Sequence, residues 1–216
     1  MIGKIIVKVC GITRQADAVV ALEFGADYLG INCWDGSPRF VPANRRAALL
    51  REIPPGKRVA VTVNPTDDEA SAFIAEGFDI VQVHFDPAKK ECDPAGLSTF
   101  IGKAHLWLAP KLTDGAEWPK TLIPLAAGFI HDAHAPNSFG GTGKQADWAR
   151  FQKLTQTYPD ALWILAGGLG PTNVEAALKA EPKGLDLNSG VELAPGLKSA
   201  ELLFEVKQAL LKNDQS

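Results

Sequence analysis

The sequence predicts a fold of the α/β class, in which parallel strands alternate with helices. Short apolar runs alternate with helical patterns along the 216 residues, and no Pro- or Ser-rich linker separates two halves. Parallel strands need a crossover connection, usually a helix, so this alternation favours parallel pairing. A chain of this length can bury a large core, and we expect one domain over residues 1–216.

Eight short apolar runs predict the strands of this fold. They are Ile5–Cys10, Tyr28–Ile31, Arg58–Val63, Ile80–Val83, Leu106–Ala109, Gly128–His131, Leu162–Ala166 and Leu185–Leu187.

Helical patterns occupy the intervals between these runs. The first, Gln15–Phe24, is followed by Gly25, which can end a helix in the left-handed conformation. The pattern at Glu117–Leu122 is the weakest. The remaining helices are predicted at Pro42–Arg51, Asp67–Glu76, Asp93–Gly102, Asp147–Thr157, Pro171–Ala180 and Ser199–Lys212.

Two architectures fit eight such units, an open doubly wound sheet and a closed barrel. A dinucleotide-binding sheet would carry Gly-x-Gly-x-x-Gly after its first strand, and Cys10-Gly11-Ile12-Thr13 does not supply it. Eight units in one uninterrupted run favour the closed (β/α)₈ barrel, the TIM barrel.

Charge and composition exclude several classes of function. The net charge is −3 and the basic residues are scattered, so no surface for nucleic acid is indicated. No apolar run approaches the roughly 20 residues of a membrane span. The three cysteines include no Cys-x-x-Cys pair, which argues against a disulfide framework or a zinc site. We expect a cytoplasmic protein, a monomer or a homodimer.

Polar residues gather at the C-terminal ends of the predicted strands, where barrel active sites lie. Cys10 ends the first strand, Gln82 and His84 end the fourth, Asp132 ends the sixth, and Arg39 follows the second. A thiolate can take a proton and a carboxylic acid can give one, so Cys10 and Asp132 could form a base–acid pair. Considered alone, Cys10 fits a small buried side chain better than a catalyst, because most free cysteines are buried.

Glycines follow the seventh and eighth strands. Gly167 and Gly168 end one, and Ser189 and Gly190 follow the other. Glycine lets backbone N–H groups approach an anion, and barrels often bind phosphate in these two loops. We therefore expect a small phosphorylated substrate. Gly140-Gly141-Thr142-Gly143-Lys144 lacks the spacing of a P-loop and predicts an active-site lid.

Strand alternation places Lys8 on the same face as Cys10, one layer deeper. A buried ammonium needs a partner, and the eighth strand, which adjoins the first in a closed barrel, offers Asp186. We predict an ion pair between Lys8 and Asp186 inside the barrel. A metal-dependent sugar-phosphate epimerase is a competing interpretation, with His84, Asp132 and His134 as conceivable ligands.

Taken together, these motifs resemble the phosphoribosylanthranilate isomerase family of tryptophan biosynthesis over nearly the whole chain. The resemblance rests on Lys8-Val9-Cys10-Gly11-Ile12-Thr13, Gly25-Ala26-Asp27-Tyr28-Leu29-Gly30, Ser37-Pro38-Arg39, Val61-Thr62-Val63-Asn64, Val81-Gln82-Val83-His84, Gly140-Gly141-Thr142-Gly143-Lys144, Asp147-Trp148, Leu165-Ala166-Gly167-Gly168-Leu169 and Asn188-Ser189-Gly190-Val191-Glu192.

The resemblance implies an Amadori rearrangement without a metal or organic cofactor. It implies that Cys10 is the general base, Asp132 the general acid, and Arg39 the group that holds the anthranilate carboxylate. The remaining residues expected to bind substrate are Gln82, His84, Gly141, Gly167, Gly168, Ser189 and Gly190.

The chain departs from the family pattern in the segment Phe129-Ile130-His131-Asp132-Ala133-His134 and at single positions. Phe85 stands where the family usually has Gly and is expected to add bulk near the mouth of the barrel, and Asn188 stands where Ser is common. These departures leave open a diverged paralogue that acts on another phosphorylated ligand. A catalytically silent barrel that only binds a sugar phosphate is a further alternative, against which the presence of both Cys10 and Asp132 argues.

Overall fold

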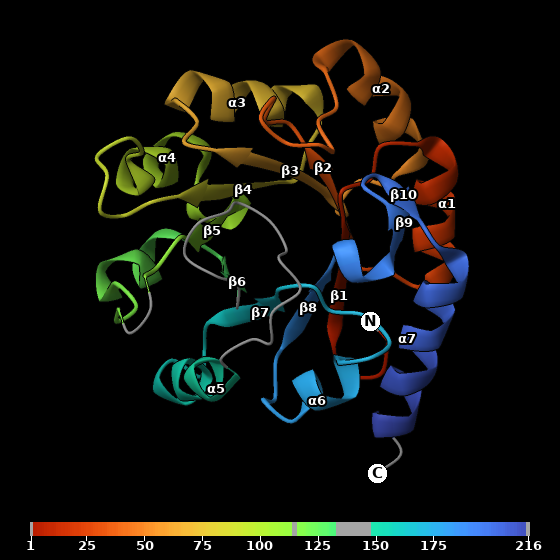
Figure 1. Ribbon diagram of the computed structural model, residues 1–216. Helices are drawn as coiled ribbons and strands as arrows, with labels where there is room; N and C mark the ends of the chain where they lie inside the picture. The colour runs from red at the N-terminus through yellow and green to blue at the C-terminus, as the bar shows by residue number, and fades with distance from the viewer. Residues whose placement is uncertain (1, 114–115, 133–147, 215–216) are drawn as a thin grey trace.

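Eight parallel strands close into a barrel in sequence order in the computed structural model, which describes residues 2–113, 116–132 and 148–214. Figure 1 looks into the ring of strands, with the helices outside it. The strands are β1 Ile6–Cys10, β2 Tyr28–Asn32, β3 Arg58–Val63, β4 Ile80–Phe85, β5 Leu106–Pro110, β6 Gly128–Asp132, β7 Leu162–Ala166 and β8 Gly184–Leu187. The predicted TIM barrel is confirmed.

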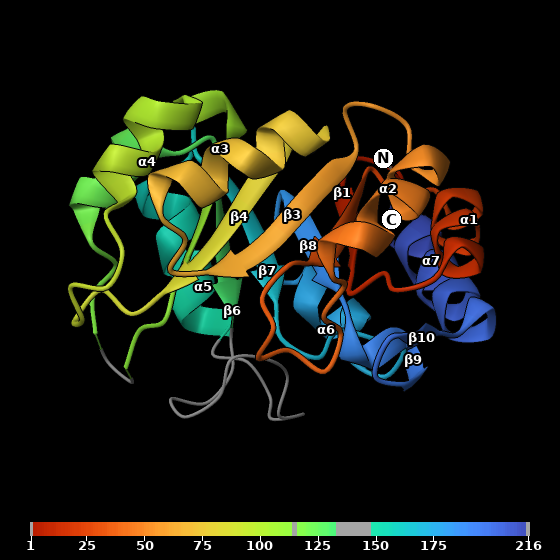
Figure 2. The same ribbon diagram turned by 90° about the horizontal axis from the view of Figure 1, so that it is seen from above.

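Helices surround the barrel. Figure 2 shows the strands between α3 and α4 on one side and α1 and α7 on the other. The helices are α1 Gln15–Phe24, α2 Ala43–Glu52, α3 Asp67–Glu76, α4 Pro94–Ile101, α5 Trp148–Thr157, α6 Val174–Leu178 and α7 Ala200–Asp214, with 3₁₀ turns η1 Lys103–His105, η2 Lys120–Leu125 and η3 Ser189–Val191. Within the described part of the chain, none of these helices is both long and apolar enough to cross a bilayer.

Local signals fix the helix ends. At the start of α3, the Thr66 hydroxyl accepts the Glu69 N–H and the Glu69 carboxylate accepts the Thr66 N–H, so two donors that the helix cannot satisfy are paired. At the end of α1, Gly25 adopts a φ of 107° and its N–H bonds the carbonyls of the last turn.

Two predicted helices differ from the structure. The pattern at Glu117–Leu122 corresponds to η2, a 3₁₀ turn that contains Pro124, which has no N–H to donate. The helix predicted from Pro171 is shorter, and α6 begins at Val174. The side chain of Asn173 accepts the Gly170 N–H and donates to the Gly168 carbonyl, so it holds these residues in a turn before the helix.

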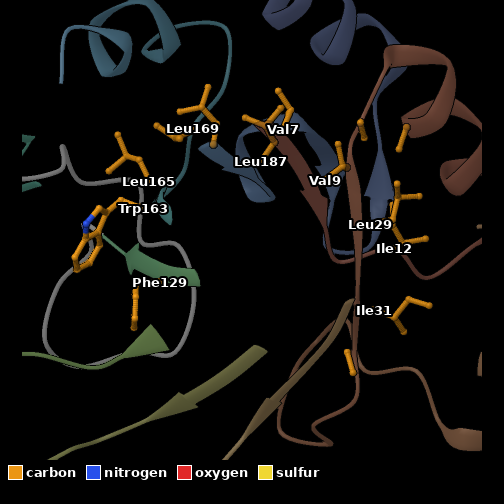
Figure 3. Packing of buried hydrophobic residues seen from close by; sticks show 14 of the residues in the cluster. Val7, Val9, Ile12, Leu29, Ile31, Phe129, Trp163, Leu165, Leu169 and Leu187 are labelled. Atoms are coloured by element: carbon orange, nitrogen blue, oxygen red, sulfur yellow. The ribbon is translucent and has the colours of Figure 1, made fainter. Parts of the chain in front are cut away.

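Apolar side chains form two layers, one inside the barrel and one between the barrel and the helices. Figure 3 shows part of the outer layer, including Val7, Leu29 and Trp163. The inner layer contains Val59, Trp107 and their neighbours from the other strands. Strand alternation produces both layers, because successive side chains point to opposite faces.

The β9–β10 hairpin follows the barrel's last strand. Its two antiparallel strands, β9 Glu192–Ala194 and β10 Leu197–Lys198, lie between η3 and α7 in the sequence. The Thr13 hydroxyl, in the loop after β1, donates to the Gly196 carbonyl at 2.7 Å. The first and last strand-end loops are therefore tied together.

Candidate active site

A cavity of about 360 Å³ opens at the C-terminal ends of the strands. This volume lies within the range that binds small molecules. The structure brings eight of the ten predicted site residues to its wall, namely Cys10, Arg39, Gln82, His84, Asp132, Gly167, Gly168 and Ser189. Gly141 and the rest of the predicted lid lie outside the described residues. Trp34 also lines the cavity, so its indole is available to face an aromatic ligand.

Cys10 is held in the floor of this cavity by β1. Its side chain is 5% exposed, and its strand neighbour is Gly30 of β2. A Cβ atom on Gly30 would lie 2.9 Å from the Cys10 Sγ and 3.0 Å from the Lys8 Cε, so only glycine leaves room here. Burial raises the pKa of the Cys10 thiol, and the Lys8 ammonium opposes that shift without cancelling it.

Lys8 lies beneath Cys10 and forms the predicted ion pair. Its Nζ donates to the Asp186 Oδ2 at 2.8 Å, and the Lys8 side chain is fully buried. Burial alone would lower the pKa of Lys8, but Asp186 and, to a smaller extent, Cys10 together outweigh it, and the net shift is upward. The lysine therefore stays charged below the thiol, as the sequence predicted.

Gln82 and His84 face the same cavity from β4. The Gln82 Nε2 lies 2.9 Å from the His84 Nε2, which accepts this hydrogen bond when the ring is neutral. Burial, with a smaller contribution from the Lys8 charge, lowers the pKa of His84 to about 4. His84 is thus a neutral imidazole at physiological pH, with no positive charge to offer a substrate.

Alternation decides which strand-end residues reach the cavity. Asp132 ends β6 on the cavity side, whereas His131 is buried on the outer side, where its ring packs near Phe151 and Trp118. Phe85 follows the same rule after His84: it is 2% exposed and belongs to the outer layer. The expectation that Phe85 adds bulk near the mouth is therefore wrong.

The predicted phosphate loops take two different conformations. Gly167 and Gly168 have φ angles of 115° and 62°, which residues with a side chain rarely adopt, and both line the cavity. Gly190 does not line it. A Cβ on Gly190 would collide with the Leu169 carbonyl, so glycine there lets the loops after β7 and β8 pack together. That Gly190 binds the substrate stays a prediction.

Arg39 lies at the cavity wall in a network of buried charges. Its Nη2 donates to the Glu192 Oε2 at 2.5 Å, and its Nε lies 3.0 Å from both Glu192 oxygens. The Lys198 Nζ donates to Glu192 at 2.7 Å and to the backbone and side-chain oxygens of Asn188. The pKa of Glu192 is lowered, because these two cations outweigh the effect of burial.

Sequence reasoning missed this network. Glu192 ends the motif Asn188-Ser189-Gly190-Val191-Glu192, but its position in the sequence does not reveal that its partner is Arg39, 153 residues away. Lys198 is brought back by the β9–β10 hairpin, for which Pro195-Gly196 between two short apolar segments was the only local signal.

The structure brings together two of the three residues considered as metal ligands. His84 and Asp132 both line the cavity, and His134 lies outside the described residues. In residues 2–113, 116–132 and 148–214, no group of three His, Cys, Asp or Glu side chains is placed to hold a metal ion.

Comparison with known proteins agrees with this architecture. Residues 7–209 match the family described as N-(5'phosphoribosyl)anthranilate (PRA) isomerase. The N-(5'-phosphoribosyl)anthranilate isomerase of Bordetella avium is 35% identical, with 96% of each chain covered. That of Magnetococcus marinus is 39% identical, over 89% of this chain and 88% of the relative.

A solved structure shares the fold closely. The crystal structure of phosphoribosyl anthranilate isomerase from Thermus thermophilus superposes with a TM-score of 0.81 at 29% identity, covering 97% of this chain and all of the other. The family match spans most of the chain, and the site residues lie in one cavity at the strand ends. The chain therefore belongs to the N-(5'-phosphoribosyl)anthranilate isomerase family.

Proposed function

We propose that this chain isomerises N-(5'-phosphoribosyl)anthranilate to 1-(2-carboxyphenylamino)-1-deoxyribulose 5-phosphate, with Cys10 as the general base and Asp132 as the general acid. One observation carries the assignment of roles: the thiol of β1 and the carboxyl of β6 line the same cavity. A ligand between them could receive a proton from one side and lose one to the other.

The proposed reaction has three steps. Asp132 donates a proton to the ring oxygen of the ribose as the bond between C1′ and that oxygen breaks, which leaves a protonated imine. The Cys10 thiolate removes the proton from C2′, and the electron pair neutralises the imine to give an enolamine. C1′ then gains a proton while the C2′ hydroxyl loses one, which produces the ketone.

The electrostatics of the floor support Cys10 as a base. Burial raises the pKa of the thiol, so the thiolate, once formed, binds a proton strongly. The Lys8 ammonium beneath it and the positive charge of the opened imine both favour the thiolate in the bound complex. The Lys8 ammonium, which is paired with Asp186, is too buried to bind substrate directly.

The two ends of the substrate have matching groups in the cavity. Gly167, Gly168 and Ser189 would hold the ribose phosphate through backbone N–H groups. Arg39 would hold the anthranilate carboxylate, and Trp34 offers an aromatic face to the ring between them. A cationic group for each anion is not needed, because backbone donors suffice for phosphate.

A direct test measures the purified protein's conversion of the substrate and its rescue of a tryptophan auxotroph that lacks the isomerase. Cys10→Ala and Asp132→Asn should each reduce kcat about 10²- to 10⁴-fold. Cys33→Ala is the matched control, because Cys33 is buried in the outer layer and should leave kcat unchanged. A folded wild-type protein without activity refutes the function, and an active Cys10→Ala variant refutes the role of the thiol.

A further inference from the structure

The charges around Arg39 leave one set of donors available to a ligand. The Nε and Nη2 of Arg39 are occupied by Glu192, and the Nη1 has no partner among the described residues. The Lys198 Nζ uses its three N–H bonds on Glu192 and on the two Asn188 oxygens, and its side chain is fully buried. A ligand can therefore reach Arg39 but not Lys198.

The same network leaves one net positive charge. Arg39 and Lys198 contribute two cations and Glu192 one anion, and all three side chains are at most 13% exposed. A network of only Arg39 and Glu192 would be neutral, so Glu192 would repel an incoming carboxylate with no second cation to offset the repulsion. With Lys198 present, the charge matches one carboxylate.

Glu192 is itself rigidly held. Besides the two cations, the Gly196 N–H donates to its Oε1 at 3.0 Å, and the hairpin that carries it is tied to Thr13. The Arg39 chain lies over the peptide next to the base, since a Cβ on Gly11 would be 2.6 Å from the Arg39 Cδ. The guanidinium is thus fixed relative to Cys10 from both ends.

We propose that Glu192 and Lys198 are positioning residues that aim Arg39 at the ligand's carboxylate and so make the site selective for an ortho-carboxylated aromatic amine. This inference rests on the proposed function. Neither residue touches the substrate. Glu192 fixes the direction of the guanidinium, and Lys198 offsets the charge of Glu192.

The test compares two stable analogues by calorimetric titration. One is the reduced product, 1-(2-carboxyphenylamino)-1-deoxyribitol 5-phosphate, and the other lacks only the carboxylate. The wild type should bind the first at least tenfold more tightly, because a charge-assisted contact is lost with the second.

Three variants separate the possible causes. Glu192→Asp keeps the charge but draws the carboxylate back by about 1.5 Å, one C–C bond. It should abolish most of the preference for the carboxylated analogue. The analogue without the carboxylate should bind within about twofold of its affinity for wild type. Lys198→Met keeps the direction but removes the offsetting charge, and should also reduce the preference. Glu76→Gln is the matched control, because Glu76 pairs with an arginine away from the cavity, and it should change neither affinity.

Each outcome decides a different question. If neither analogue binds to wild type, the proposed function fails. If both bind equally, Arg39 does not recognise the carboxylate and the positioning proposal falls with it. If wild type discriminates and a folded Glu192→Asp variant discriminates as well, the positioning proposal alone is overturned. Should Glu192→Asp fail to fold by circular dichroism, an undiminished preference in Lys198→Met overturns it instead.

Discussion

A methyl group added at Gly30 tests whether the placement of the Cys10 thiol limits catalysis. The backbone of Gly30 is not in the left-handed region, so alanine is compatible with the strand. Its Cβ would lie 2.9 Å from the Cys10 Sγ and 3.2 Å from the Lys8 Nζ. Ordinary van der Waals contact begins near 3.4 Å, so the thiol must move by about half an ångström or the strands must separate.

The expected loss follows from the sensitivity of catalysis to distance. A misplacement of about 1 Å can cost about 10²-fold in rate, so half of that shift predicts a loss of about tenfold in kcat for Gly30→Ala. KM should change less, because the groups that would hold the phosphate and the carboxylate lie in other loops. Overpacking should also lower the free energy of unfolding by about 1–3 kcal/mol.

Gly184→Ala separates placement of the thiol from general strain. A Cβ on Gly184 would meet the Ile164 Cγ1 at 3.1 Å and the Ile6 carbonyl at 3.3 Å, and Ile6 is four residues from Cys10 along β1. This variant should lose stability but keep its kcat. Steady-state kinetics and urea unfolding measure both quantities. A Gly30→Ala enzyme with kcat within twofold of wild type, or equal kcat losses in both variants, would refute the reasoning.

Two further predictions concern the ion pair beneath the cavity and the histidine in its wall. Lys8→Met leaves the Asp186 carboxylate buried without its cation and should lower the free energy of unfolding by about 3–5 kcal/mol in urea titrations. The double variant Lys8→Met/Asp186→Leu should recover most of this lost stability. No recovery would mean that the unpaired carboxylate is not the cause of the loss. The pKa of His84 is lowered from 6.5 to about 4, so below pH 6.5 the unfolded chain binds the proton that the folded protein rejects. Stability should therefore fall as the pH drops from 6.5 towards 4, by up to about 3 kcal/mol, and a His84→Asn variant that shows the same fall would contradict this assignment.

The fold and the position of the site follow from local patterns in the sequence. Strand alternation predicted that Lys8 lies below Cys10, and barrel closure then placed β8 beside β1, which made Asp186 its partner. The same alternation, applied to His84, would have predicted that Phe85 points outward. The family pattern gives the residue type at this position but not the face of the strand on which its side chain lies.

The remainder depends on contacts that no local pattern encodes. Glu192 bonds Arg39 across 153 residues, and Lys198 reaches Glu192 only because a hairpin reverses the chain. The packing role of Gly190 cannot be read from the sequence for a similar reason. A glycine that admits an anion and one that admits a neighbouring carbonyl look the same in sequence, and only the packing of the two loops tells them apart.

The Lys8–Asp186 pair also has a consequence for how the chain folds. Its members are 178 residues apart, one in the first strand of the barrel and one in the last. During synthesis the first strand, with the lysine and the thiol that it carries, emerges long before its neighbour β8. Until β8 has left the ribosome, Asp186 is not available to Lys8, so the ion pair below the base cannot form. The cation beneath the thiol therefore gains its partner only once both ends of the barrel have been synthesised.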